Sequence, residues 1–169
     1  SKVREQYEEN PYPRWVSLGL PLKPASISGV TKKLELSIFD PKINDVENPT
    51  ILIGGCGTGQ HSIGTAARFT SSTVLAVDLS LASLAYAKRQ TQELSFRNVE
   101  YMHADILDLG KLDSQFDIVE SVGVLHHMDD PMAGWRVLTR CLKMGGLMKI
   151  GLYSKLARQD VMSMREEIN

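Results

Sequence analysis

The feature that most constrains this chain is a glycine cluster, GGCGTGQ, at residues 54–60. It follows a short apolar run at 51–53 and precedes a segment of helical character from about Thr58 to Phe69. Glycine in such a turn lets the backbone reverse tightly and approach a ligand closely. Four glycines within six residues are more than an ordinary strand–helix turn needs. The cluster therefore predicts a ligand-binding loop, with a plain structural turn as the alternative.

The glycine spacing excludes one common kind of loop. The order is Gly55-x-Gly57-x-Gly59, whereas a dinucleotide-binding turn has the form G-x-G-x-x-G. Its third glycine would stand at position 60, which is Gln60, and counting from Gly57 fails because position 62 is Ser62. The sequence therefore argues against a pyrophosphate-binding turn.

Short apolar runs alternate with helical patterns along the rest of the chain. This alternation predicts a parallel sheet covered on both faces, with ligands bound beyond the carboxyl ends of its strands. A short helix is expected at 27–39 and a surface loop at 44–49. After the strand at 51–53, further strands are expected at 73–77, 98–104, 116–121 and 147–153. Further helices are expected from Ser80 to Leu94, from Pro131 to a stop at Gly145-Gly146, and at 154–168.

Composition limits the class of protein. A chain of 169 residues is long enough for one domain. The net charge of -1 and pI of about 6.4 indicate no domain-wide basic field for nucleic acid or an acidic membrane. The two cysteines stand in unrelated contexts, which favours a reducing cytoplasm. No stretch approaches the length of a membrane span, and the first residues do not resemble a signal peptide.

Two carboxylates stand where predicted strands end. Asp78 ends the second strand, where a carboxylate can accept hydrogen bonds from both hydroxyls of a ribose. Asp105 ends the third strand, where it can accept one from an exocyclic amine such as that of adenine. Each residue can instead cap the helix that follows it.

The fourth strand leads into a histidine pair. After Glu120 the chain has small residues, Ser121 and Gly123, which let it pass beside a ligand. His126 and His127 have no cysteine or third histidine nearby, so no metal site is expected. Either histidine can act as a base near neutral pH. The alternative is that one packs against the core and the other is solvated.

Residues 50–154 resemble a class I S-adenosylmethionine-dependent methyltransferase. The resemblance lies in ILIGGCGTG, VLAVDLS, HADILDL and FDIVESVGVLHHMDDP, which match four motifs in order, and in LKMGGLMKIGLYS, which is similar to the fifth-strand region. The run VLHHMDDP is nearest to the small-molecule and general methyltransferases. The resemblance implies a Rossmann-like, doubly wound α/β sheet of five parallel strands in the order 3-2-1-4-5, with helices on both faces.

The resemblance also implies which residues bind S-adenosyl-L-methionine. The glycines would pass under its methionine and ribose, Asp78 would hold the ribose hydroxyls, and Asp105 would hold the adenine amine. Glu120 and Ser121 would line the methyl-donor side. The implied cofactor-binding set is Gly55, Cys56, Gly57, Gly59, Asp78, Leu79, Asp105, Ile106, Glu120 and Ser121.

The chain departs from the family pattern in two ways. The family often has an acidic residue two places before the first motif glycine, and here that residue is Ile53. Contacts to the cofactor's amino group must then come from elsewhere, or affinity is reduced. The family also continues past its fifth strand into an antiparallel hairpin, which this chain lacks. We therefore expect residues 46–169 to be the methyltransferase core of a longer chain.

Residues 1–45 are expected to form a helical and aromatic arm. Its segment YEENPYPRW, at 7–15, partly resembles the Asn-Pro-Pro-Tyr catalytic loop of enzymes that methylate adenine in DNA. The motif order disfavours that interpretation, because the fourth strand already fills the corresponding position. We expect Tyr7, Tyr12 and Trp15 to cover the cofactor or acceptor as a lid, or else to pack on the outer helices.

These observations predict a cytoplasmic methyltransferase acting on an unidentified acceptor, more a small molecule or protein than nucleic acid. His126 or His127, or Tyr7 or Tyr12, would orient the acceptor or take its proton. QYEENPYPRW and GLYSKLARQD resemble bacterial methyltransferases fused to tetratricopeptide repeats, which implies such repeats elsewhere in the full-length chain. The alternatives are a non-catalytic module that binds S-adenosylmethionine and a nicotinamide-dependent oxidoreductase.

Overall fold

A computed structural model describes residue 15 and residues 17–153 of the chain. The helix expected at 154–168, together with Tyr7 and Tyr12, lies outside the described residues. The elements in chain order, with η marking short 3-10 helices, are α2 (Ile27–Lys33), η1 (Pro41–Asp45), β1 (Thr50–Gly54), α3 (Gln60–Arg68), β2 (Thr73–Asp78), α4 (Leu81–Glu93), β3 (Val99–His103), η2 (Ile106–Lys111), β4 (Phe116–Val122), η3 (Leu125–His127), α5 (Pro131–Arg140) and β5 (Leu142–Gly151).

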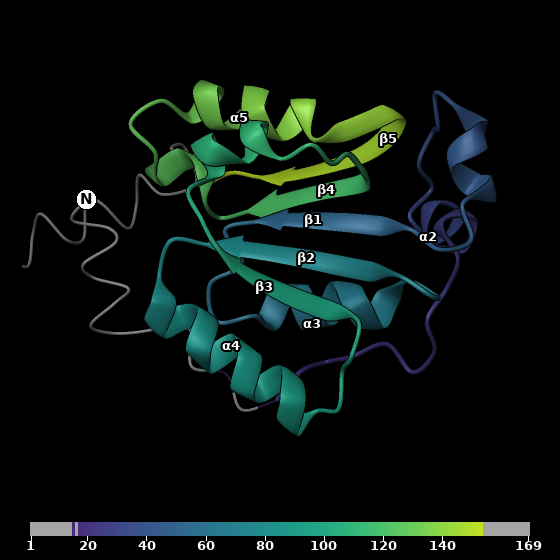
Figure 1. The fold of residues 1–169 in the computed structure, drawn as a ribbon. Helices are drawn as coiled ribbons and strands as arrows, with labels where there is room; N and C mark the ends of the chain where they lie inside the picture. The colour runs from purple at the N-terminus through teal and green to yellow at the C-terminus, as the bar shows by residue number, and fades with distance from the viewer. Residues whose placement is uncertain (1–14, 16, 154–169) are drawn as a thin grey trace, which may run out of the picture.

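The strands form one parallel sheet in the order β3-β2-β1-β4-β5, which confirms the expected fold class. Helix α5 lies on one side of the sheet, and α3 and α4 lie on the other (Figure 1). In β1, Ile51 and Ile53 belong to the core cluster on the α3 side, whereas Leu52 belongs to the cluster on the α5 side. All three are fully buried, as expected for a central strand covered on both faces.

Two helices begin at the residues that the sequence predicts. Ser80 accepts a hydrogen bond from the backbone N–H of Ser83 and is the N-cap of α4. Asp130 accepts one from the N–H of Met132, with Pro131 in the first turn of α5. Because these caps follow the ends of β2 and β4 closely, both connections lie at the carboxyl edge of the sheet.

The predicted boundary between the last described helix and β5 is wrong. Helix α5 ends at Arg140, and β5 begins at Leu142, so Gly145 and Gly146 lie inside the strand instead of stopping the helix. The pairing of β4 with β5 shifts register between Phe116 and Ile118, and this irregularity accommodates the extra residues. Gly145 has a φ of +77°, which glycine adopts without strain.

The N-terminal helix is shorter than predicted, because α2 ends at Lys33 and Glu35 has a φ of +54°. Part of the predicted 44–49 loop belongs instead to η1. Ile27 of α2 and Ile43 of η1 belong to the same core cluster as β1. The described part of the arm therefore packs on the sheet, and the proposed division after residue 45 stays a prediction.

Asp117 fastens the start of β1 to β4. Its Oδ2 accepts hydrogen bonds from the N–H of Thr50 at 2.9 Å and from Thr50 Oγ1 at 2.8 Å. Its Oδ1 accepts one from Lys143 Nζ at 2.9 Å. Burial opposes ionisation here, but the bonds from Thr50 and Lys143 hold the pKa of Asp117 below its usual value of 3.8.

Replacing Asp117 by Ala should lower the free energy of unfolding by about 1–3 kcal/mol at pH 7, because Thr50 loses its buried acceptor. A group with a depressed folded-state pKa stabilises the protein above its unfolded pKa. The difference from wild type should therefore shrink below pH of about 3.9. Urea unfolding of wild type and Asp117→Ala, at pH 7 and at a pH below about 3.9, measures this difference.

The matched control is Lys143→Ala, which should lower the free energy of unfolding by less than about 1 kcal/mol, because the Lys143 side chain is partly exposed. A larger loss for Lys143→Ala than for Asp117→Ala would contradict this account.

Candidate cofactor site

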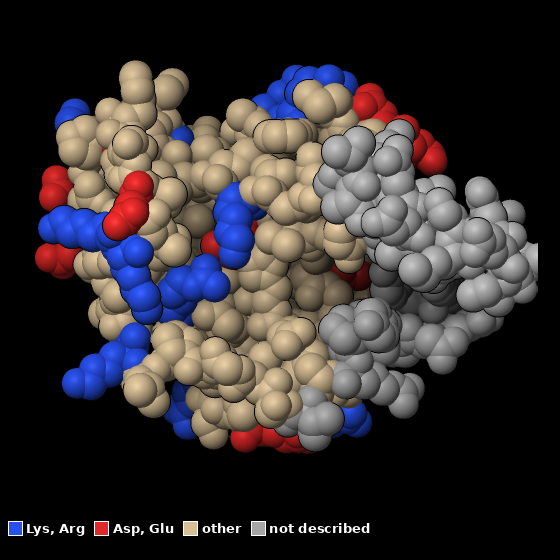
Figure 2. Space-filling model, turned by 180° about the vertical axis from the view of Figure 1, so that it is seen from behind, with Lys and Arg blue, Asp and Glu red and all other residues tan. Residues whose placement is uncertain are grey.

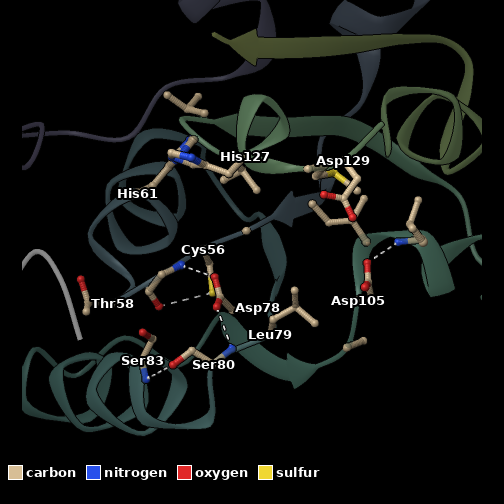
Figure 3. A pocket seen from close by; sticks show the side chains of 18 of the residues that line it. Cys56, Thr58, His61, Asp78, Leu79, Ser80, Ser83, Asp105, His127 and Asp129 are labelled. Atoms are coloured by element: carbon tan, nitrogen blue, oxygen red, sulfur yellow. Dashed lines mark hydrogen bonds between the residues drawn. The ribbon is translucent and has the colours of Figure 1, made fainter. Parts of the chain in front are cut away.

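A cavity of about 540 Å³ opens at the carboxyl edge of the sheet, a volume in the range of small-molecule sites. Four segments that follow strands line it, together with the first turns of α3, α4 and α5 (Figure 3). The lining residues are Gly55, Cys56, Gly57, Thr58, Gln60, His61, Asp78, Leu79, Ser80, Ser83, Ala104, Asp105, Ile106, Leu107, Val122, Val124, His127, Met128, Asp129, Asp130 and Ala133.

The glycine loop owes its shape to backbone conformation and close packing. Gly55, Gly57 and Gly59 have φ of +78°, +52° and +86°, which disfavour other residues. A Cβ on Gly55 would stand 2.4 Å from Val124, and one on Gly59 would stand 2.7 Å from Ala87. Gly55 and Gly57 line the cavity, whereas Gly59 ends the loop as the N-cap of α3. Close packing therefore requires glycine at Gly55 and Gly59 even without a ligand.

Asp78 holds the loop and the next turn together. Its Oδ2 accepts a hydrogen bond from the N–H of Gly57 at 2.7 Å, and its Oδ1 accepts one from the N–H of Ser80 at 2.9 Å. A carboxylate has about four acceptor positions, so two backbone bonds leave capacity for ligand hydroxyls. The cap of α4 considered for Asp78 from the sequence is instead Ser80, and Asp78 fixes the glycine loop to the turn before α4 while lining the cavity.

Asp105 likewise both caps a helix and lines the cavity. Its Oδ1 accepts a hydrogen bond from the N–H of Leu107 at 2.9 Å, and it is the N-cap of η2. It also lines the cavity beside the buried Ile106. In Figure 3, Asp105 lies on one side of the cavity and His61 on the other, with Asp78 between them in this view.

Cys56 lines the cavity but is not a nucleophile. It is 5% exposed. Burial, and after it the charge of Asp78, raises the pKa of Cys56 well above its usual value. The thiol is therefore protonated at neutral pH, which removes its nucleophilic form.

A charged residue lies in the core behind the cavity. Glu120, in the middle of β4, is 2% exposed. His61 Nε2 lies 2.5 Å from its Oε2, Thr65 Oγ1 donates to the same oxygen at 2.8 Å, and Arg68 Nη1 lies 3.5 Å from Oε1. Burial raises the pKa of Glu120, but the hydrogen bond and charge of His61, with Lys149 and Thr65, lower it to about 2. Glu120 is therefore an anion at neutral pH.

The two predicted histidines occupy different positions. His127 is exposed and lines the cavity, whereas His126 is partly buried and is not among the lining residues. Their ring centroids are 4.1 Å apart, and the His126 ring lies 4.3 Å from that of Tyr153. Of the pair, His127 is the one placed to meet a ligand.

Trp15 packs on the outside of the glycine loop. It is 8% exposed, and its Nε1 donates to the carbonyl oxygen of Thr58 at 3.1 Å. Its ring meets Tyr86 edge to face with centroids 6.1 Å apart, and Tyr86 Oη donates to the Trp15 carbonyl at 2.9 Å. Trp15 is not among the residues that line the cavity, and the hypothesis that it covers a ligand stays a prediction.

Most of the predicted cofactor-binding residues lie around one cavity. The exceptions are Gly59, Glu120 and Ser121. They are near lining residues in the sequence but do not themselves line the cavity. Sequence reasoning missed His61, which lines the cavity from the first turn of α3. The available signal was its position directly after the glycine loop.

Within residues 15 and 17–153, no three His, Cys, Asp or Glu side chains are grouped so that they could hold a metal ion. The same described part of the chain contains no helix with the length and apolar character needed to cross a membrane.

Replacing Trp15 by Ala should lower the free energy of unfolding of the unliganded protein by about 3 kcal/mol, because a buried indole leaves a cavity. Tyr86→Phe should cost only about 1 kcal/mol, since it removes one hydrogen bond and keeps the ring. Thermal or urea unfolding without ligand measures both. An unchanged melting temperature for Trp15→Ala would contradict a structural role and favour a lid.

The stability of the wild type should fall as pH drops from about 4.5 towards about 2, the ordinary and folded-state pKa values of Glu120. The sign follows because a group with a depressed folded-state pKa stabilises the protein above its unfolded-state pKa. This stabilisation is lost as the pH falls through the folded-state pKa. Glu120→Gln should be less stable at pH 7 and should lose less stability over this range. Urea unfolding across this pH series tests the expectation, and parallel curves would contradict it.

Comparisons with known proteins agree with this architecture. Residues 51–146 match a family model described as a methyltransferase domain. The chain is 33% identical over 121 residues to the uncharacterized protein syc1184_c of Synechococcus sp., covering 71% of this chain and 29% of that protein. It is 33% identical over 114 residues to the ubiquinone biosynthesis O-methyltransferase of Pseudomonas fluorescens, covering 67% of this chain and 47% of that protein.

Solved structures share the fold. PKMT2 from Rickettsia typhi, in complex with AdoHcy, has a TM-score of 0.63 and 25% identity, covering 72% of this chain and 24% of that chain. The [4+2]-cyclase SpnF, at a TM-score of 0.57 and 20% identity over 83% of this chain and 56% of its own, shares the fold alone. This chain spans less than half of each curated relative named above. Because the family model matches more than half of the chain, the chain belongs to the methyltransferase-domain family, the class I S-adenosylmethionine-dependent methyltransferases.

Proposed function

We propose that this chain binds S-adenosyl-L-methionine and transfers its methyl group to a small-molecule or protein acceptor. The observation that carries the proposal is the Asp78 carboxylate, which accepts a hydrogen bond from the N–H of Gly57 and lines a cavity of about 540 Å³, in a chain of this family. This arrangement brings a carboxylate and a glycine backbone together on the lining of the same cavity.

The donor set of the cavity fits this cofactor. Asp78 retains acceptor capacity for ribose hydroxyls, and Asp105 keeps an oxygen besides the one that caps η2. Ile106 and Leu79 supply apolar surface beside these carboxylates. Gly55 and Gly57 let the backbone come close to the ligand. When bound, S-adenosylmethionine supplies an electrophilic methyl group on a sulfonium.

The chain's own residues would position the acceptor and receive its proton. His127 lines the cavity from η3, so it is the residue we assign to orient the acceptor or to accept a proton. The His126 ring contacts both the His127 ring and the Tyr153 ring at a tilted angle, with interplanar angles of 51° and 49°, and these contacts would fix the orientation of the His127 ring. The protonated Cys56 thiol argues against a covalent enzyme intermediate.

Charge supports an acceptor other than nucleic acid. Exposed Lys32, Lys33 and Lys42 belong to α2 and η1, which precede β1. In Figure 2, Lys and Arg gather towards that end of the molecule, with Asp and Glu among them. The cavity, at the opposite end of the strands, is lined by Asp78, Asp105 and two further aspartates. A polyanion would meet carboxylates there, which disfavours its approach.

The remaining parts of the proposal rest on sequence. Similarity to an O-methyltransferase favours a hydroxyl acceptor. The resemblance of QYEENPYPRW and GLYSKLARQD to repeat-fused methyltransferases favours tetratricopeptide repeats in the full-length protein. The two cysteines, both buried and free, suit a reducing cytoplasm.

Isothermal titration with S-adenosylmethionine and S-adenosylhomocysteine tests the cofactor assignment. Asp78→Ala should weaken binding of both roughly tenfold or more, because ribose hydroxyls and the glycine loop lose one shared acceptor. Asp108→Ala is the matched control, since Asp108 is exposed and pairs with Lys111 on the surface. No binding by the wild type would refute the cofactor assignment, and equal binding by Asp78→Ala would refute the ribose role.

Two further measurements separate the alternatives. A fluorescence titration with NADH that shows tight binding would favour a nicotinamide-dependent oxidoreductase. Binding of S-adenosylmethionine without methyl transfer to any hydroxyl, amine or thiol acceptor would favour a non-catalytic module.

A further inference from the structure

The hydrogen bond between Glu120 and His61 connects a buried charge to the cavity. A carboxylate with 2% exposure in the centre of a sheet is costly unless it is fully paired. Its partners His61, Thr65 and Arg68 all come from α3, at positions i, i+4 and i+7 on one face of that helix. Of these partners, only His61 is among the residues that line the cavity.

The pair also fixes which nitrogen of His61 carries a proton. Glu120 is ionised at neutral pH and can only accept hydrogen bonds, so the Nε2 of His61 must donate. The other ring nitrogen then remains for a second partner, as in carboxylate–histidine pairs that orient a functional imidazole. Figure 3 shows the His61 ring on the side of the cavity away from Asp105.

The position of the carboxylate explains the apolar residue in β1. Ile53 and Glu120 are direct neighbours in the register of β1 and β4. Ile53 packs in the core cluster on the α3 side, the side on which Glu120 meets α3. The carboxylate nearest to the position of Ile53 is thus on the adjacent strand, and it reaches the cavity only through His61.

We propose, on the basis of the proposed function, that His61 contacts the amino-acid portion of S-adenosylmethionine and that Glu120 is the positioning residue that holds it. The nucleoside is assigned to Asp78 and Asp105, so the charged ammonium and carboxylate of the methionine lie towards the start of α3. Gly59, the N-cap of α3, offers no side chain to the first N–H groups of that helix, which leaves donors for a carboxylate.

The test compares two ligands that share the nucleoside. S-adenosylhomocysteine carries the amino acid, and 5′-methylthioadenosine lacks it. His61→Ala should weaken S-adenosylhomocysteine binding by roughly tenfold to hundredfold, the loss expected for a hydrogen bond to a charged group. It should change 5′-methylthioadenosine binding by less than about twofold. His61→Gln, which keeps a donor and an acceptor, should recover part of the lost affinity.

Glu120→Gln should also weaken S-adenosylhomocysteine binding more than 5′-methylthioadenosine binding. The loss of affinity should be smaller than for His61→Ala, because the His61 side chain is still present but is no longer held by a carboxylate. Arg68→Gln is the matched control, since it removes another Glu120 partner that does not line the cavity, and it should leave the ratio of the two affinities unchanged. If Glu120→Gln does not fold, the two His61 variants decide the proposal alone.

Equal losses for both ligands in His61→Ala would show a merely structural role and overturn the inference, as would no loss for either. Failure of the wild type to bind S-adenosylhomocysteine would overturn the cofactor assignment itself. Wild-type binding of S-adenosylhomocysteine with unselective His61 variants would overturn only the role of His61.

Discussion

The hydrogen bond from the N–H of Gly57 to the carboxylate of Asp78 is the contact on which the cavity depends. It joins the loop after β1 to the end of β2, and the N–H groups of Gly55 and Cys56 reinforce it by donating to the carbonyl of Val77. Because the loop is fixed to the neighbouring strand, α3 begins at a defined point and its first turn faces the cavity. The same carboxylate retains capacity for a ligand, so the structural and binding roles reinforce each other.

The buried anion of Glu120 is the second constraint. An unpaired carboxylate in this position would be strongly destabilising, so α3 must present its polar face to β4. That requirement orients α3 and brings His61 to the cavity wall. α3 therefore buries polar side chains such as Thr65 beside its apolar residues Ile63 and Ala66, whereas a helix next to a sheet normally buries an apolar stripe. In this fold the electrostatic requirement of one strand residue shapes the site in front of it.

Local signals predicted the elements well where they acted alone. Apolar runs predicted the strands, and Ser80 and Asp130 predicted the starts of α4 and α5. They failed at Gly145-Gly146, because glycines can stop a helix or sit inside an irregular strand, and only pairing with β4 decides between these. The helix expected at 27–39 was also too long, because α2 ends at Lys33, Glu35 has a φ of +54°, and Ile38 packs against the core cluster from outside the helix.

The sequence by itself determined the alternation of strands and helices, the glycine loop and the carboxylates at the strand ends, because these depend on local patterns and on the common edge of a parallel sheet. Only the tertiary structure decided which of these residues meet. Glu120 and His61 are 59 residues apart, and Trp15 and Thr58 are 43 apart. No local pattern encodes such pairs, because the requirement to neutralise a buried charge or to bury an indole exists only after the chain has folded.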